Sequence, residues 1–333
     1  MPPTSGVPAQ RAASTLGPTV PMYFGRFVLE APRGIAVATQ RAQVRLVTVE
    51  EVGWPVTTRQ GQPEATGFDQ LWTDRVAALR RDESLRPPTV PDVIIQTRRL
   101  GPHLRLLFRH DSDVDAAFVS AEALADGGDH ALWIRTEYRA GSEANVISYF
   151  SQLASRYRPY PVGVRRSELV PAFHLERGAF EQAYHIEESV RWSLAIDPSW
   201  SVADASLSTR SGRNPDWGTG LIADWRGRLA EAPAEVRGEI VRAGPRTVAG
   251  LGGEEVIVRL HTDRGTSLAF QFAFPGEKGQ ALRPQFTADM ATINSDAARS
   301  GRVEARAVAL WDQLLGSARP LPPGSPPTPA GPP

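Results

Sequence analysis

Hydrophobic and polar residues alternate along this chain with two periods, and each period predicts a different kind of element. A period of two is typical of a strand with one buried face, whereas recurrence at every third and fourth position is typical of an amphipathic helix. The first pattern predicts strands over residues 24–29, 44–49, 93–99, 103–109, 116–123, 131–138, 172–177, 183–187, 189–196, 203–209, 238–243, 254–261, 267–274 and 285–291. The second pattern predicts helices over residues 68–79, 146–157, 217–229 and 303–315.

The order of these elements divides the chain into two halves. Each half contains strands, a helix, a further block of strands and a second helix, which favours an α+β fold of two similar antiparallel-sheet-plus-helix domains. We interpret the Pro- and Gly-containing basic stretch at 158–170 as the linker between them. The predicted parts are a disordered tail over 1–20, an N-terminal α+β domain over 21–162, a C-terminal α+β domain over 163–319 and a Pro-rich disordered tail over 320–333.

The segment SLAFQFAFPGEKGQALRP, residues 267–284, contains an unusually aromatic strand. The alternation places Phe270, Phe272 and Phe274 on one side of the strand, and a turn at 263–265 precedes it. Pro275-Gly276 ends the strand. Because a buried aromatic side chain covers about 150–250 Å², we expect this row to face the core and to anchor the sheet against a helix.

The composition excludes several classes of protein. Lys plus Arg and Asp plus Glu number 37 each, so the net charge is zero and gives no bias toward nucleic acid or an anionic membrane. The absence of cysteine excludes thiol nucleophiles, disulfides and cysteine-ligated metals. No apolar run reaches the length of about 18 residues that is typical of a membrane helix, and the first residues show no signal-peptide pattern. We therefore expect no transmembrane segment.

The sequence contains no recognisable constellation for catalysis or cofactor binding. Its six histidines are dispersed, and no His-Glu-x-x-His or Gly-x-Ser-x-Gly motif occurs. The glycine-rich stretch 250–255 resembles the start of a dinucleotide loop, but Glu255 stands at the last glycine position and a strand follows it. We predict no catalytic residue, no metal and no cofactor. A carboxylate pair of the glycosidase kind leaves no spacing signature, so that chemistry stays an alternative.

Two polar connections are candidate contact sites for a partner. Asp111, Asp113 and Asp115 lie two residues apart in a turn, where they could bind a hard cation or form a solvated surface. Arg210 and Arg213 lie in the connection RSGRNPDW, which is rich in residue types found at interface hot spots. The alternative for this connection is the start of a helix with Asp216 as its N-cap.

Four segments near the C-terminus carry a family resemblance: VAGLGGEE at 248–255, FQFAFPG at 270–276, LRP at 282–284 and ALWDQLLGS at 309–317. In order and spacing they resemble the C-terminal domain of bacterial type VI secretion immunity proteins of the fourth lipase-immunity class. Upstream, FGRFVLEAP at 24–32 resembles the N-terminal opening of that family. The resemblance marks as structural the residues Gly25, Arg26, Gly250, Glu254, Glu255, Phe272, Phe274, Pro275, Gly276, Pro284, Trp311 and Asp312.

The resemblance implies a function in binding. A member of this family is expected to be a two-domain clamp that binds a cognate phospholipase effector, an α/β-hydrolase, in the cleft between its domains. Such a protein neutralises the effector in the periplasm without catalysis and protects the producing cell and its kin. The resemblance also makes residues 163–319 an immunity domain, and Asp111, Asp113, Asp115, Arg210 and Arg213 become candidate contacts with the effector.

The sequence departs from the family in two respects. A periplasmic immunity protein is expected to begin with a signal peptide or lipoprotein start, and no such pattern is visible in this sequence. The family commonly has cysteines near the positions of Tyr23 and His174, and both are absent here, so packing must replace any cross-domain staple. The alternative hypothesis is a periplasmic module that binds a small ligand or an envelope component in the interdomain cleft. A carboxylate enzyme in the same cleft is a weaker form of that alternative.

Overall fold

The computed structural model describes residues 16–45, 47–54, 56–59, 62–65, 67–112, 116–117, 119–160, 172–181, 187–211, 220–233, 235–293 and 301–322. The chain forms two compact units. Unit 1 comprises residues 1–40, 170–174 and 183–333, and unit 2 comprises residues 41–169 and 175–182. Segments from both ends of the sequence therefore meet in unit 1.

Unit 1 contains an antiparallel sheet with the strand order β16-β17-β18-β19-β15-β14, followed by the first part of β3. A two-residue turn joins β16 to β17. Its residues Ala249 and Gly250 both have positive φ, 52° and 79°, as a tight hairpin turn of this twist requires. The strands are β3 (Ile35–Val44), β14 (Glu188–Ile196), β15 (Val202–Arg210), β16 (Arg237–Val248), β17 (Leu251–Thr262), β18 (Gly265–Phe274) and β19 (Gln285–Thr292).

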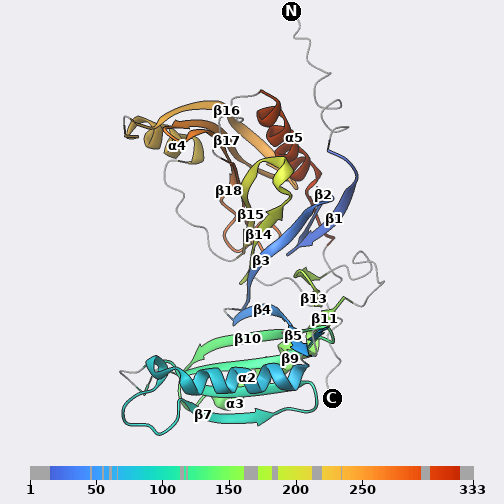
Figure 1. The fold of residues 1–333 in the computed structure, drawn as a ribbon, viewed down its shortest axis with the longest axis vertical. Helices are drawn as coiled ribbons and strands as arrows, with labels where there is room; N and C mark the ends of the chain where they lie inside the picture. The colour runs from blue at the N-terminus through green and yellow to red at the C-terminus, as the bar shows by residue number, and fades with distance from the viewer. Residues whose placement is uncertain are drawn as a thin grey trace, which may run out of the picture. The chain divides into compact units, whose positions relative to one another are not determined.

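Two helices cover β17 and β18 of unit 1 (Figure 1). Successive side chains of a strand point to opposite faces. On one face the ring of Phe270 lies 5.6 Å from the ring of Trp311 in α5 (Gly301–Ser317). On the other face Val256 and Val258 pack with α4 (Leu221–Ala230). The predicted aromatic row is confirmed as core, since Phe270, Phe272 and Phe274 are all buried.

A small sheet closes unit 1 near the N-terminus. Its strands are β1 (Thr19–Phe24), β2 (Phe27–Pro32) and β20 (Arg319–Pro320), and a bridge joins Gly25 to His174 in β12 (Phe173–His174). The rings of Tyr23 and His174 lie 5.1 Å apart. Aromatic packing thus occupies the place for which the resemblance implies cysteines. A short 3-10 helix, η3 (Pro198–Trp200), precedes β15.

Unit 2 has its own antiparallel sheet with the order β4-β10-β9-β8-β7, in which the last part of β3 pairs with β4. A hairpin, β5 (Val56–Arg59) and β6 (Gln62–Ala65), and a strand pair, β11 (Tyr157–Pro159) and β13 (Gly178–Phe180), complete it. The sheet strands are β4 (Val47–Gly53), β7 (Ile94–Arg99), β8 (Leu104–His110), β9 (Val119–Asp126) and β10 (His130–Tyr138).

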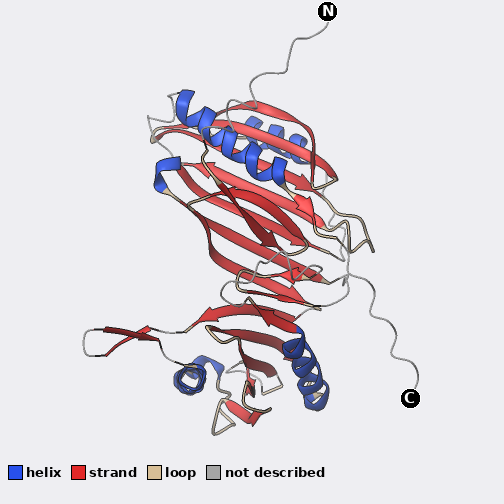
Figure 2. Cartoon of the chain, turned by 90° about the vertical axis from the view of Figure 1, so that its right-hand side faces the viewer, coloured by secondary structure: helices blue, strands red, loops and turns tan. Residues whose placement is uncertain are grey.

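The unit 2 sheet has a helix on each side (Figure 2). Helix α2 (Phe68–Arg81) buries Leu79 against Leu107 and against Val93 and Ile94, and η1 (Glu83–Leu85) follows it. Helix α3 (Glu143–Arg156) buries Val146, Phe150 and Leu153. The face on the α2 side also carries charged residues, which are described below. None of the described helices has the length and apolar character needed to cross a membrane.

The predicted α+β class is confirmed, and most strands and helices lie where the periodicity predicts them. The strand predicted at 24–29 is wrong, because Gly25 (φ 55°) begins a turn there and the segment is a hairpin of β1 and β2. The strand predicted at 44–49 is likewise wrong: the chain turns between Val44 and Val47 and joins β3 to β4. Of the strand predicted at 172–177 only β12 (Phe173–His174) forms, and β13 begins after it at Gly178.

Several predictions lie partly or wholly outside the described residues. They include the linker beyond residue 160, the strand at 183–186, the N-cap at Asp216, and the tails at 1–15 and 323–333. In the described parts of the tails, β1 begins at Thr19 and Leu321 is buried. The domain boundaries, the clamp and its cleft stay predictions.

Candidate functional site

A buried carboxylate on β17 connects the β16–β17 hairpin to α5. Glu255 accepts a hydrogen bond from the indole Nε1 of Trp311 at 2.6 Å and forms ion pairs with Arg242 and Arg246. The same two arginines pair with Asp312, at 2.6 and 2.8 Å. Burial by itself raises the pKa of Asp312, but hydrogen bonds and charges from both arginines outweigh burial and lower that pKa. The motif residues Glu255, Trp311 and Asp312 thus form one cluster.

A second motif residue, Arg26, forms a buried ion pair. Its Nε and Nη2 donate to the two carboxylate oxygens of Glu188 at 3.0 and 2.7 Å, and both side chains are almost fully buried. The Arg26 guanidinium also lies over the ring of Phe173, 5.9 Å from its centroid. This geometry fixes the turn after β1 against β14, because a two-bond pair between planar groups tolerates little rotation.

Two further motif residues, Glu254 and Gly276, act at the start of α4 and at the turn after β18. Glu254 accepts a hydrogen bond from the backbone N–H of Ile222 at 3.1 Å, at the first turn of α4. Gly276 has φ 84°, and a Cβ placed on it would lie 2.6 Å from the backbone nitrogen of Gln285. Only glycine fits there without strain, so the end of the aromatic strand depends on it.

A shallow apolar groove of about 480 Å³ lies beside these motif residues in unit 1. Its walls come from the β16–β17 turn at Gly250, the loop carrying Leu282 and Pro284, and the segment around Pro320. Leu282 is among the exposed large hydrophobic residues of the described chain. Such an exposed apolar side chain beside a groove is typical of an interaction surface.

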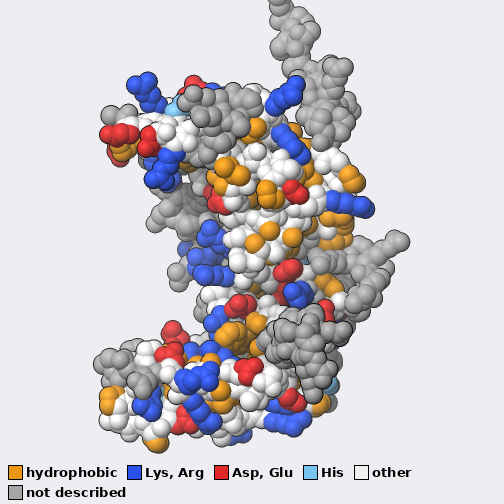
Figure 3. Space-filling view, viewed as in Figure 1, with side chains coloured by type: hydrophobic (Ala, Val, Ile, Leu, Met, Phe, Trp, Pro, Cys, Tyr) orange, Lys and Arg blue, Asp and Glu red, His pale blue; other side chains and the backbone are white. Residues whose placement is uncertain are grey.

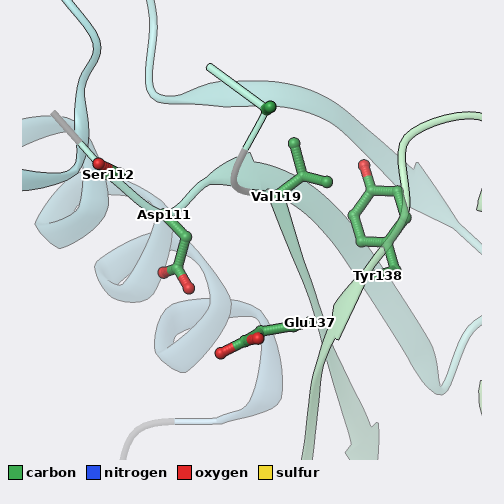
Figure 4. Close-up of a pocket in the computed structure, with 6 residues that line it drawn as sticks. Asp111, Ser112, Val119, Glu137 and Tyr138 are labelled. Carbon is green, nitrogen blue, oxygen red and sulfur yellow. The ribbon is translucent and has the colours of Figure 1, made fainter. Parts of the chain in front are cut away.

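Asp111, one of the predicted contact residues, lines a pocket of about 300 Å³ in unit 2 (Figure 4). The carboxylates of Asp111 and Glu137 lie on one side of it and the ring of Tyr138 on the other. Burial and the nearby carboxylate of Glu143 raise the pKa of Tyr138 to about 12. The phenol is therefore neutral at physiological pH, and acidic side chains determine the charge of the pocket.

Arg109 connects Asp111 of this pocket to the buried carboxylate of Glu122 on β9. Arg109 contacts Asp111 and also donates through Nε to Glu122 at 2.6 Å. Arg75 of α2 donates two further bonds to Glu122, at 2.9 and 2.7 Å. Burial alone raises the pKa of Glu122, but the hydrogen bonds and charges of Arg75 and Arg109 outweigh burial and lower that pKa. Glu122 therefore stays ionised and holds both arginines.

The other predicted contact residues are not brought to this pocket. Arg210 belongs to unit 1, where it is exposed at the end of β15 opposite Gln285. Asp113, Asp115 and Arg213 lie outside the described residues, so their roles as contacts stay predictions. Sequence reasoning missed Glu122, and the signal that could have found it is an acidic residue at a buried position of a predicted strand.

Sequence reasoning also missed a buried polar chain in unit 2. His130 lies between the carboxylate of Asp129 and the hydroxyl of Tyr157, each at 2.5 Å, and Tyr157 donates to Glu51 at 2.5 Å. Burial and the adjacent Glu51 raise the pKa of Tyr157, which keeps its proton. The backbone of Arg177 donates to the other oxygen of Glu51 at 2.8 Å, so these bonds fix β11 and the turn before β13 to the sheet.

The chemistry of these clusters is that of structural ion pairs. Each buried carboxylate described above has an arginine, tyrosine or tryptophan donor as its partner. Among the residues that the structure describes, no group of three or more His, Asp or Glu side chains is arranged to hold a metal ion. Within unit 1 these ion pairs support a rigid surface beside the groove, and within unit 2 they support a rigid charged face.

Comparison with solved structures shows which fold this is. The immunity protein TplEi of the type VI secretion system from Pseudomonas aeruginosa, in its apo form, matches with a TM-score of 0.69 and 16% sequence identity, over 92% of this chain and 98% of that chain. The crystal structure of the Tle4–Tli4 complex matches with the same values. TplEi complexed with an "L" peptide matches with a TM-score of 0.64 and 15% identity, over 91% of this chain and 98% of that chain. The fold is shared over almost the entire length.

The sequence itself identifies the C-terminal region. None of the curated proteins matches this chain. Residues 172–323 match the family model described as the Tle cognate immunity protein 4 C-terminal domain. This range includes β17, β18 and α5, with the Glu255 cluster and the aromatic row. Residues 172–323 therefore carry the sequence pattern of the Tle cognate immunity protein 4 C-terminal domain.

Proposed function

We propose that this protein is an immunity protein that binds and neutralises a cognate lipase effector of a type VI secretion system. The observation that carries the proposal is the family match over residues 172–323. The shared fold supports it, because one of the similar structures is a Tle4–Tli4 complex and another is a type VI immunity protein. The protected cell is the one that produces the effector, together with its kin.

We further propose that neutralisation occurs by binding, without catalysis, and in the periplasm. The buried charged groups support a binding role, since Glu255, Glu122 and Arg26 are engaged in ion pairs that stiffen the units. A rigid surface loses little conformational entropy on association, which favours tight binding. Our contact hypothesis places the effector against exposed polar turns such as those of Asp111 and Arg210.

Co-expression tests this function. The lipase whose gene neighbours that of this chain is directed to the periplasm of a bacterial host, with and without this chain carrying an export signal. We expect the lipase alone to stop growth, and the chain to restore growth and to co-purify with the lipase. A catalytically inactive lipase is the control for toxicity. Unrelieved toxicity together with no co-purification would contradict the proposal.

A second experiment distinguishes this function from the alternative of a small-ligand module. A small-ligand module would bind a metabolite or envelope component in the absence of any protein partner. We expect the purified chain to show no such ligand by native mass spectrometry and to form a complex only when the lipase is added.

A further inference from the structure

A tryptophan on the α2 side of the unit 2 sheet contacts two arginines. The guanidinium carbon of Arg75 lies 4.5 Å from the ring centroid of Trp133, and that of Arg135 lies 4.4 Å from it. Both distances are well inside the range of about 6 Å over which a cation is attracted to an aromatic face. We call these three residues, Arg75, Trp133 and Arg135, the Trp133 platform.

Both arginines of the platform are held by ion pairs with glutamates. Arg75 is held by its two bonds to Glu122, whose side chain is only 2% exposed. Arg135 donates to Glu50 at 2.9 Å, and these two side chains are 38% and 41% exposed. The carboxylate that neutralises Arg75 is therefore buried, whereas the side chains of Arg75 and Arg135 are 27% and 38% exposed. A partner that approaches this part of the sheet meets two guanidinium groups and an aromatic ring, with the carboxylate of Glu50 beside Arg135.

The platform also contains hydrogen-bond donors without acceptors. Among the described residues, neither Nε1 of Trp133 nor Nε of Arg135 has a hydrogen-bond partner, although both atoms are buried. Unmet buried donors are rare in native proteins because desolvating them is unfavourable. A carboxylate brought by a partner offers the acceptor that Arg135 lacks, after a small rotation of its exposed side chain. Tryptophan and arginine are also the residue types that dominate interface hot spots.

The surroundings of the platform alternate in charge. Arg109 links Glu122 to Asp111, so an acidic pocket with Asp111 and Glu137 lies on the same side of the sheet as the platform. Figure 3 shows basic, acidic and hydrophobic side chains interspersed over the part of the surface that contains α2. A complementary partner therefore carries a carboxylate opposite the platform and a cationic side chain opposite the pocket. Such alternation fixes the register of binding more than its strength.

We propose that the Trp133 platform is a docking surface for a carboxylate-bearing segment of the lipase effector. The proposal rests on the proposed function, since it names where unit 2 contacts that partner. The unmet donors of Trp133 and Arg135 commit it to an acidic protein segment, because a carboxylate supplies the acceptor that these N–H groups lack. In the complex, this segment places a carboxylate beside Arg135 and contacts the edge of the Trp133 ring.

The test inverts one ion pair without changing the net charge. The double variant Arg135→Glu/Glu50→Arg keeps an opposite-charge pair but reverses the field at the platform. The matched control is Arg158→Glu/Glu181→Arg, another Arg–Glu pair of unit 2, whose side chains are 49% and 48% exposed. Affinity for the purified neighbouring lipase is measured by biolayer interferometry at two salt concentrations. The neutral pair Arg135→Gln/Glu50→Gln serves if the inverted variant does not fold by circular dichroism.

We expect the inverted platform to bind the lipase roughly tenfold or more weakly, with a reduced salt dependence, and the control pair to bind like the wild type. Equal binding by the inverted platform and the wild type would overturn the docking surface while leaving the proposed function intact. Equal weakening by the control pair would also overturn it, because the effect would then be general. No binding by the wild-type chain would remove the proposed function and the docking surface with it.

Discussion

The Glu255 cluster predicts that two acidic residues bound to the same arginines contribute very differently to stability. Glu255 is 7% exposed and accepts from Trp311, whereas Asp312 is 42% exposed. Replacing Glu255 by alanine leaves the buried indole N–H without an acceptor, which costs about 1–3 kcal/mol. It also removes the buried partner of Arg242 and Arg246, although Asp312 still pairs with both. We therefore expect Glu255→Ala to lower the free energy of unfolding by about 3 kcal/mol.

The control for this experiment is Asp312→Ala. Its carboxylate is partly hydrated, and exposed ion pairs contribute about 0–1 kcal/mol. Urea unfolding followed by far-UV circular dichroism and tryptophan fluorescence measures both variants, with Glu255→Gln as an intermediate that keeps an oxygen for Trp311. Equal losses for Glu255→Ala and Asp312→Ala, or a larger loss for Asp312→Ala, would refute the reasoning that burial decides the contribution.

Three further predictions concern stability, the first two measured by urea unfolding and the third by thermal unfolding. Arg26→Met leaves the buried Glu188 without its cation and should lower the free energy of unfolding by about 3–5 kcal/mol, whereas Arg26→Met/Glu188→Leu should recover most of that loss; no recovery in the double variant would contradict this. Gly276→Ala combines positive φ with a backbone clash and should cost clearly more than Gly279→Ala, which has positive φ but open space; equal costs would count against it. Because the pKa of Glu122 is lowered in the folded state, its stabilising contribution is present above its unfolded pKa, near 4.5, and is lost as the pH falls through the folded value. Melting temperatures measured from pH 7 to pH 3 should therefore fall at the acidic end, and less steeply in Glu122→Gln; an equally steep fall in that variant would contradict the assignment.

The elements that the sequence predicted well have local signals. The strand at Phe270–Phe274 combines strict alternation with a turn before it and Pro275-Gly276 after it, so nothing distant is needed to place it. The helix that carries Trp311 likewise shows its buried face in its own periodicity. Local patterns of this kind predict which face is buried, and the structure confirms both faces.

The features that the sequence missed depend on distant residues. The apolar run that begins at Phe24 reads as one strand, but Gly25 takes a left-handed conformation and a Cβ there would lie 2.9 Å from Val190. Glu122 has its partner Arg75 forty-seven positions earlier. Because such contacts arise only after the sheet and helix assemble, periodicity does not distinguish a buried paired carboxylate from a solvated one.

The predicted contact residues show the same limit. The sequence indicates Asp111 as a contact by its place in an acidic turn, and the structure adds that Asp111 borders a pocket and contacts Arg109. The platform at Trp133 had no signal in the sequence, because Arg75 and Arg135 come from a helix and a strand that meet only in the fold.

We propose that this chain inhibits a lipase by binding it. The most direct measurement is a titration of the purified neighbouring lipase with this chain, with hydrolysis of a phospholipid substrate as the readout. Our account predicts that activity falls linearly to near zero at an equimolar ratio and that a stable complex elutes in size-exclusion chromatography. Undiminished hydrolysis at a large excess of the chain, with the two proteins eluting separately, would contradict it.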